Sequence, residues 1–383
     1  MKKFTLPKRD LTELATPLYF ATMAAEAIYL HRRRTSVGES AGNYAWKDTV
    51  ASLSMGTLSL ALPLVSPRIL RRLNPRNGSA GKVLLGIAAG SAAVSIMAGR
   101  TAQAPNAKPE RADLRLVDPD EAPAPTFAEQ ISGVAAVVAI ATGGVVVTSL
   151  WSTTLTTANL FKRRILPDLG EGIVGFMAAL IGWDFIYYWN HRFMHTSRYM
   201  WAMHVVHHSS EHYNLSTALR QPVAEPLTTP IPYGALGLFG VRPSMISLSR
   251  GINLLWQYWI HTETVRSMGV SEEILNSPSA HRVHHGSNRQ YLDRNHGGIL
   301  ILWDRLFGTF EPEEEDVVYG LTTNIHSFNP VVIAGHEYVA IARDISRSRS
   351  WRERFRMLVG PPVGSQAPKK ATEVPVGEPR LVG

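Results

Sequence analysis

The stretch WDFIYYWNHRFMHTSRYMWAMHVVHH, residues 183–208, carries five of the fourteen histidines in the 383-residue chain. They form an H-x-x-x-H and an H-x-x-H-H pattern, and a second H-x-x-H-H lies at residues 281–285. Spacings of three and four residues place side chains on one face of a helix. Each of the three clusters can therefore direct two or three imidazole rings toward one point. The eight clustered histidines are His191, His195, His204, His207, His208, His281, His284 and His285.

The number of clustered histidines predicts a dinuclear metal site. Imidazole is the commonest side-chain ligand for metals, and eight rings supply four nitrogens to each of two ions; His261 and His296 would raise this to five. The chain has no cysteine, which excludes thiolate ligands and disulfides. It also lacks H-E-x-x-H, the pattern that supplies the general base of a zinc protease. Imidazole binds Zn, Cu, Fe and Ni, so the ligand type alone does not identify the metal. A histidine-rich pair of metals beside membrane helices fits oxygen activation by a redox metal better than it fits hydrolysis.

Composition and patterning indicate an integral membrane protein. Charged residues make up 18% of the chain, below the roughly 25% usual in soluble domains. Basic residues such as Arg32, Arg71 and Arg163 flank apolar runs, which is typical of membrane segments. The net charge of +8 therefore fits anionic lipid headgroups, and no nucleic-acid partner is expected. The candidate membrane runs are residues 16–30, 49–67, 83–99, 130–161, 172–190, 227–241 and 251–262.

The predicted fold is an all-α, integral-membrane helical bundle of about four to six spans, with a helical histidine-rich catalytic region at the membrane surface. Residues 1–127 are expected to hold N-terminal membrane segments and a polar linker. Residues 128–340 are expected to form the catalytic region, and residues 341–383 a basic, Pro/Gly-rich, disordered tail. In a bacterium the protein would lie in the cell membrane.

Asp184 is a carboxylate inside one of the apolar runs. It precedes His191 by seven residues, so on a helix the two share a face. An ionisable residue in a spanning segment is costly and usually functional. We therefore expect Asp184 to hydrogen-bond a ligand imidazole and fix its tautomer.

Three segments closely resemble the fatty acid hydroxylase/sterol desaturase superfamily. They are WDFIYYWNHRFMH (183–195), MWAMHVVHHSSEHYNLSTALRQ (200–221) and SPSAHRVHHGSNRQYLDRNHGGILILWDRLFGTFEPE (277–313). Within the superfamily, the sequence is most similar to a bacterial branch akin to alkylglycerol monooxygenase. A weaker resemblance covers YAWKDTVASLSMG, residues 44–56.

The resemblance implies a membrane-bound non-haem iron oxygenase that hydroxylates or desaturates a lipid such as a sterol, a fatty acyl chain or an ether lipid. It implies a di-iron centre of two iron ions on the cytosolic side, dioxygen as co-substrate, and an external electron donor, either a separate protein or a pterin. The eight clustered histidines would be ligands; His261 matches a further family histidine, and His296 is a possible tenth ligand. The resemblance also implies three residues that would hold the histidine ligands in place without binding the metal: Glu211, Asn214 and Arg220.

Other interpretations stay open at this point. A non-catalytic metal-binding or metal-transport membrane protein would also place histidines beside helices. Residues 38–42, GESAG, match the G-x-S-x-G pattern of serine esterases around Ser40, but that pattern needs a preceding strand and a basic run precedes it here. His212 is expected to lie outside the ligand set, and Asp304 and Arg305 are expected to form a structural ion pair.

Overall fold

A computed structural model describes residues 10–102, 125–223 and 233–362. Within these ranges the regular secondary structure is helical apart from two isolated β-bridges, Leu275 with Leu300 and Gly286 with Tyr319, which confirms the predicted all-α fold. The elements in chain order are α1 (Leu11–Val37), α2 (Trp46–Leu73), α3 (Ser79–Ala102), α4 (Phe127–Thr154), α5 (Thr157–Lys162), α6 (Ile173–Thr196), α7 (Arg198–His208), η1 (Thr217–Leu219), η3 (Ala235–Phe239), α9 (Pro243–Trp259), η4 (Gly269–Glu273), α10 (Pro278–His284), α11 (Leu302–Phe307), α12 (Pro330–Arg347) and α13 (Trp351–Val359).

Local sequence signals explain where several helices begin. α4 starts with a capping box, in which the Thr126 side chain accepts the backbone N–H of Glu129 and the Glu129 side chain accepts that of Thr126. Pro243 and Pro330 occupy the first turns of α9 and α12. Proline suits this position because its fixed φ is helical and its missing N–H would have no partner there.

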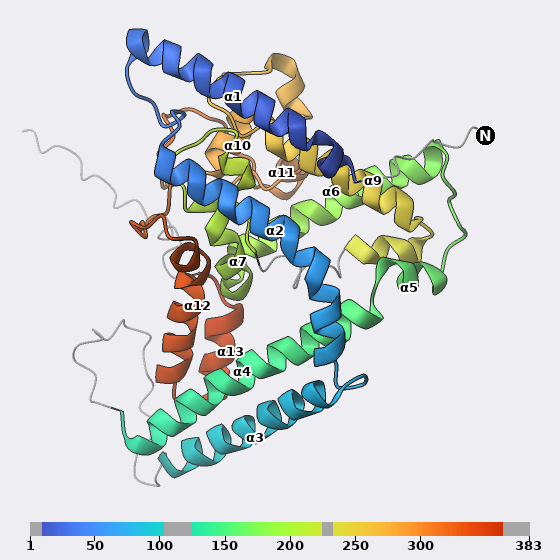
Figure 1. Ribbon diagram of the computed structural model, residues 1–383, viewed down its shortest axis with the longest axis vertical. Helices are drawn as coiled ribbons and strands as arrows, with labels where there is room; N and C mark the ends of the chain where they lie inside the picture. The colour runs from blue at the N-terminus through green and yellow to red at the C-terminus, as the bar shows by residue number, and fades with distance from the viewer. Residues whose placement is uncertain (1–9, 103–124, 224–232, 363–383) are drawn as a thin grey trace, which may run out of the picture.

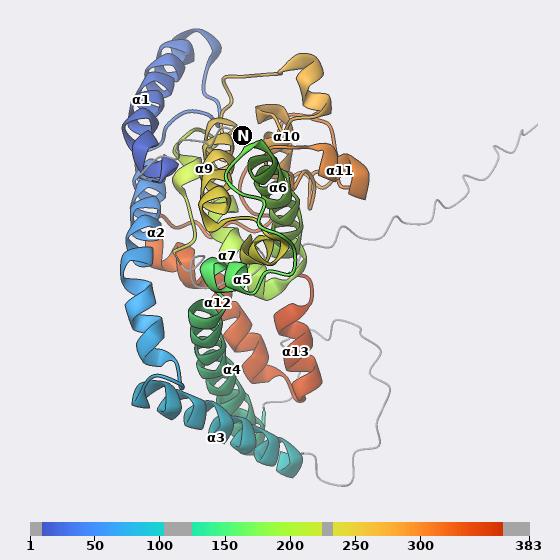
Figure 2. The same cartoon turned by 90° about the vertical axis from the view of Figure 1, so that its right-hand side faces the viewer.

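Two of the described helices, α3 and α4, are long and apolar enough to cross a bilayer. They run side by side in Figures 1 and 2. α2 would provide a third crossing if its two arms, Trp46–Leu62 and Leu64–Leu73, which are bent by 54°, form one broken span. This count is below the four to six spans expected. Polar Asp184 and Asn190 lower the hydropathy of α6, α9 has only 17 residues, and the run at 227–241 begins outside the described residues.

Small side chains let α3 and α4 pack closely. The buried Ser132 hydroxyl of α4 donates a hydrogen bond to the backbone oxygen of Ser95 on α3 over 2.8 Å. Small residues at such contacts allow helix backbones to approach, which is the usual way in which apolar helices associate in lipid. The pair forms the lower part of the molecule in Figure 1, while the histidine-bearing helices α6, α7 and α10 lie above it.

Residues 341–347 and 351–359 are helical, so the expectation of a disordered tail is wrong for this part of the segment. They form the end of α12 and all of α13, and residues 363–383 lie outside the described ranges. Arg354 of α13 is 1% exposed. Its guanidinium donates to the Ser95 and Ser132 hydroxyls over 2.8 and 2.9 Å and to the Ser348 backbone oxygen over 2.8 Å. One arginine thus joins the C-terminal helices to the α3/α4 pair.

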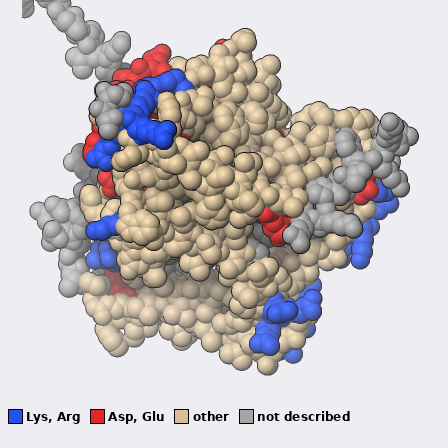
Figure 3. Space-filling model, turned by 45° about the horizontal axis from the view of Figure 1, so that its top comes forward, with Lys and Arg blue, Asp and Glu red and all other residues tan. Residues whose placement is uncertain are grey.

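The face of the molecule drawn in Figure 3 is largely uncharged. On the face drawn in Figure 3, Lys, Arg, Asp and Glu gather in a few clusters around broad uncharged areas. Large apolar side chains point outward along α2, α3 and α4, among them Leu64, Met97 and Val134, which are 76%, 67% and 61% exposed. Exposed apolar area of this extent marks a surface that contacts lipid or a partner, and it agrees with apolar helices that cross a membrane.

Replacing Arg354 by alanine should destabilise the protein by about 3 kcal/mol, because the buried Ser95 and Ser132 hydroxyls lose the guanidinium donor and a cavity forms. Thermal unfolding of the detergent-solubilised chain measures this effect. Arg352→Ala, at an exposed position of the same helix, is the control and should leave the melting temperature unchanged. Equal melting temperatures for the two variants would contradict the proposed role of Arg354.

Candidate metal centre

The first two histidine clusters lie on consecutive helices that meet at a corner. α6 carries His191 and His195 near its C-terminal end, and Ser197 separates α6 from α7. α7 then carries three further histidines, of which His207 and His208 lie in the last turn. All five imidazole rings are buried. The turn at Ser197 therefore brings two helix ends together with their histidines inside.

The third cluster lies on the short helix α10, whose start is fixed by its sequence. The Ser277 side chain accepts a first-turn backbone N–H and Pro278 follows directly, both typical of a helix N-terminus. The helix carries His281 and His284, and His285 ends it as the C-cap. His261 stands two residues beyond the end of α9. These four rings are also buried.

The structure brings nine of the ten predicted histidines together in two buried groups. Within each group, one ring nitrogen of every residue lies within 4.8 Å of the others. The groups adjoin, since the stacked rings of His208 and His285 have centroids 4.5 Å apart. The five-histidine group contains His191, His195, His204, His208 and His284, and the four-histidine group contains His207, His261, His281 and His285.

Each H-x-x-H-H cluster divides between the two groups. His204 and His208, four residues apart, join the five-histidine group, while His207 between them joins the other. On α10 the pair spaced by four residues, His281 and His285, joins the four-histidine group and His284 does not. A spacing of four keeps side chains nearly in line along a helix, and the third histidine is turned aside. α7 and α10 therefore each contribute to both groups.

The spacing of the ring nitrogens fits metal coordination. In the five-histidine group, the Nε2 atom of His204 lies 2.8 Å from that of His191 and 3.0 Å from that of His208. In the other group, the Nε2 atom of His261 lies 3.0 and 3.1 Å from those of His207 and His281. A metal–nitrogen bond of about 2.1 Å puts ligand nitrogens at right angles about 3.0 Å apart. The residues therefore fit two metal ions.

The rings are in the form that binds metal. Burial is the main cause that lowers the pKa of the six histidines on and beside α7 and α10 well below the usual value, and neighbouring histidines lower it further. At neutral pH these rings are uncharged, and each keeps a nitrogen lone pair for a ligand bond. In the four-histidine group, the outer Nδ1 atoms of His207 and His261 donate to the backbone oxygens of Arg220 and Gln257 over 3.3 and 2.5 Å. These bonds leave Nε2 as the free nitrogen.

His296, the tenth predicted ligand, lies next to the five-histidine group but does not belong to it. Its ring is 1% exposed, and its centroid is 5.0 Å from that of His195 and 5.7 Å from that of His191. Neither ring nitrogen has a hydrogen-bond partner among the described residues. The backbone oxygen of His296 nevertheless accepts a hydrogen bond from the Nδ1 atom of His191 over 2.9 Å.

Asp184 does not contact an imidazole, so the expectation that it fixes a ligand tautomer is wrong. It shares a face with His191, but seven residues of helix separate their Cα atoms by about 10 Å. Its buried carboxylate accepts hydrogen bonds from the backbone N–H groups of Ile299 and Leu300 over 2.6 and 3.0 Å, and from the side chain of Trp303 over 3.0 Å. Asp184 therefore fixes the segment that follows His296.

Of the three residues expected to support the ligands, Arg220 is the one that does so directly, through its backbone oxygen. Its guanidinium is held by Asp48 of α2 over 2.9 Å and by the Ser209 hydroxyl over 2.9 Å, all buried. Asn214 donates to the backbone oxygen of Gly42 over 3.2 Å and organises the loop after α7. Glu211 is exposed and belongs to neither histidine group.

Glu26 of α1 is a supporting residue that the sequence did not single out for this role. Its buried carboxylate accepts hydrogen bonds from the backbone N–H of Leu215 over 2.8 Å, from the Tyr44 hydroxyl over 2.7 Å, and from the hydroxyl of Thr262. Thr262 directly follows His261. The sequence signal was a carboxylate inside an apolar run. It did not identify the partners of Glu26, because they come from distant parts of the chain.

Several remaining expectations can now be compared with the structure. Asp304 and Arg305 do not pair, because Asp304 accepts the backbone N–H groups of His296 and Gly297 over 2.7 Å each, whereas Arg305 pairs with Glu273 over 3.0 Å. Adjacent helical residues do not face each other. His212 joins neither group. Ser40 lies in a loop between α1 and α2, so the strand that an esterase elbow requires is absent from this described segment.

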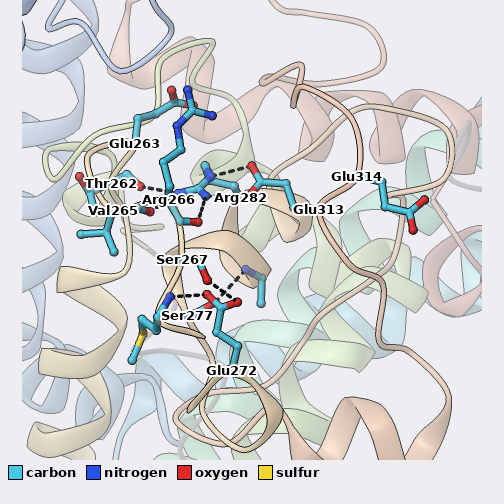
Figure 4. Close-up of polar contacts among 12 residues, drawn as sticks. Thr262, Glu263, Val265, Arg266, Ser267, Glu272, Ser277, Arg282, Glu313 and Glu314 are labelled. Carbon is cyan, nitrogen blue, oxygen red and sulfur yellow. Dashed lines mark hydrogen bonds and ion pairs between the residues drawn. The ribbon is translucent and has the colours of Figure 1, made fainter. Parts of the chain in front are cut away.

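Arg282 lies between His281 and His284 and holds α10 against the segment after His261. It is 2% exposed, and all five of its N–H donors are used (Figure 4). Two pair with the Glu313 carboxylate over 2.7 and 2.6 Å, and three reach the backbone oxygens of residues 262, 265 and 266 over 2.8 to 3.1 Å. This planar fork suits arginine and cannot be reproduced by lysine.

Replacing Arg282 by lysine should destabilise the protein by about 2–4 kcal/mol and weaken metal binding mainly in the four-histidine group, because Arg282 links the chain beside His261 to that beside His281. Thermal unfolding and bound-metal analysis measure the two effects. Arg289→Lys, at an exposed position, is the matched control. The assigned role is wrong if the two variants melt at one temperature and bind equal amounts of metal.

Comparison with known proteins places the histidine groups in a described family. Residues 176–309 match the family model for fatty acid hydroxylase. Human alkylglycerol monooxygenase is 47% identical over 193 residues, which cover 50% of this chain and 43% of that protein. The Danio rerio alkylglycerol monooxygenase is 54% identical over 150 residues, covering 39% and 33%.

A more distant relative is human lathosterol oxidase, 25% identical over 177 residues, with 42% of this chain and 57% of that protein covered. No solved structure gave a significant match. The chain spans less than half the length of the alkylglycerol monooxygenases that it matches. All ten predicted histidine ligands lie within the matched segment. The chain therefore carries, at residues 176–309, a domain of the fatty acid hydroxylase family within the fatty acid hydroxylase/sterol desaturase superfamily.

Proposed function

We propose that this protein is a membrane-bound non-haem di-iron oxygenase that hydroxylates or desaturates a lipid with dioxygen and electrons from an external donor. The observation that carries the proposal is the pair of adjacent, buried groups of five and four histidines. The matched family and the names of its relatives, alkylglycerol monooxygenase and lathosterol oxidase, support oxidation of a lipid. An alkylglycerol is the first substrate to assay, because the human and Danio rerio alkylglycerol monooxygenases are 47% and 54% identical to the matched parts of the chain, whereas lathosterol oxidase is 25% identical.

In this proposal the nine grouped histidines hold two iron ions. His296 lies beside the five-histidine group and is the candidate for a tenth ligand. Such a pair supplies the redox chemistry with dioxygen that an unreactive lipid C–H bond requires. The protein's own part is to fix the rings and keep water out: every grouped ring is buried. Arg220, Gln257 and Arg282 hold the four-histidine group from outside.

The cellular setting follows from the same features. The apolar helices α3 and α4 would anchor the domain in a membrane, which is the cell membrane if the organism is bacterial. The metal groups would face the cytosol, where an electron-donor protein or a pterin can reach them. The lipid substrate would arrive from the bilayer, which the exposed apolar side chains of α2, α3 and α4 would contact.

The test combines metal analysis with lipid profiling. The purified full-length chain should contain two iron ions, and His195→Ala and His207→Ala, one in each group, should each lose at least about 100-fold in activity and part of the iron. His31→Ala, at an exposed position of α1 outside both groups, is the control. In a deletion strain, the wild-type gene and not the His207→Ala gene should restore a lipid that differs by one added oxygen or two lost hydrogens.

Other outcomes point to other functions. Iron that is bound without dioxygen consumption in the presence of reductant and lipid would favour a non-catalytic metal-binding protein. An active chain with no redox metal contradicts the proposal outright. Loss of activity in Ser40→Ala with the iron retained would instead support an esterase.

A further inference from the structure

A four-residue loop, Asp293-Arg294-Asn295-His296, lies against the five-histidine group. It provides acceptors for the outer nitrogens of three of the five rings. The Nδ1 atom of His195 lies 3.3 Å from the Asp293 carboxylate, and the Nδ1 atoms of His284 and His191 donate to the backbone oxygens of Arg294 and His296 over 2.9 Å each. The four-histidine group takes its acceptors from elsewhere, at Arg220 and Gln257.

The backbone of this loop adopts an unusual conformation. Asp293 and Asn295 have φ values of 58° and 54°, in the left-handed region that residues other than glycine adopt at a cost. Such a conformation persists only where the surroundings determine it. Here the Asn295 side chain donates to the backbone oxygens of Ala280 and Glu311 over 3.0 and 2.8 Å, and its oxygen accepts the N–H of Glu311 over 2.9 Å. The loop is therefore held in the shape that presents its acceptors to one histidine group.

The two groups differ in the charge of their outer partners. Within the described residues, Asp293 is the one carboxylate that lies within ion-pair distance of a grouped ring; the other outer partners reported above are uncharged backbone oxygens. A carboxylate behind a metal-binding imidazole fixes its orientation and makes it a stronger electron donor. Neutral oxygens fix the orientation with less effect on donor strength. The five-histidine group thus has one ring of greater donor strength.

We propose that Asp293 is a positioning residue that orients His195 and makes the metal position of the five-histidine group the more electron-rich of the two. The inference rests on the proposed function, because it requires a metal ion in each group. It assigns unequal roles to the two positions: the one supported by Asp293 binds its metal more tightly and stabilises its oxidised form.

The experiment compares full-length chains loaded with ⁵⁷Fe. Asp293→Asn removes the charge but keeps the shape and the tolerance of asparagine for a left-handed backbone. Asp316→Asn is the matched control, because Asp316 is exposed on a neighbouring loop and belongs to neither group. We expect the wild type and Asp316→Asn to show the same two Mössbauer doublets. Asp293→Asn should shift one doublet and weaken iron binding at one position by about 10–100-fold.

A second variant separates the carboxylate from the backbone strain. Asp293→Gly relieves the left-handed conformation, so the metal-free protein should be at least as stable as the wild type, while one iron position should weaken as in Asp293→Asn. The inference fails, and the proposed function stands, if Asp293→Asn has the same doublets and iron affinities as Asp316→Asn. The same conclusion follows if Asp293→Asn lowers the iron affinity of both positions equally. A wild type that binds no pair of iron ions overturns the proposed function and the inference together.

Discussion

Neighbouring imidazole nitrogens that lie about 3 Å apart in a buried interior are the constraint on which this structure depends. Their lone pairs repel one another, and a buried polar atom without a partner costs free energy. A cation at the centre of each group converts both penalties into ligand bonds. Arg282, Arg220 with Asp48, and Glu26 fix the chain segments that bring the rings to this distance.

The sequence predicted the part of the site that depends on local geometry. Histidines three and four residues apart must share a helix face, so the clusters on α6, α7 and α10 could be identified from spacing alone. His261 was predicted from family resemblance and lies in the four-histidine group. The all-helical fold followed from long apolar runs with basic flanks. The division of each H-x-x-H-H between two groups was not predicted, because it depends on how separate helices are oriented.

The remaining differences have physical reasons. Asp184 lies on the predicted helix face, yet two helical turns exceed the reach of a carboxylate, and its partners come from residues 299–303. Asp48 and Arg220 meet across 172 residues of sequence, a pairing that no local pattern reports. The C-terminal segment has a basic and Pro/Gly-rich composition that indicates disorder, but Arg354 finds buried acceptors on α3 and α4 and keeps α13 folded. Tertiary contacts therefore outweigh composition there.

The two histidine groups share their supports. α7 provides His204 and His208 to one and His207 to the other, and α10 provides His284 to one and His281 and His285 to the other. An ion bound in either group restricts both helices, so part of the conformational entropy that the second ion would have to overcome is already lost. The ion that binds first should consequently ease the binding of the second, even though the two positions differ in their own affinity.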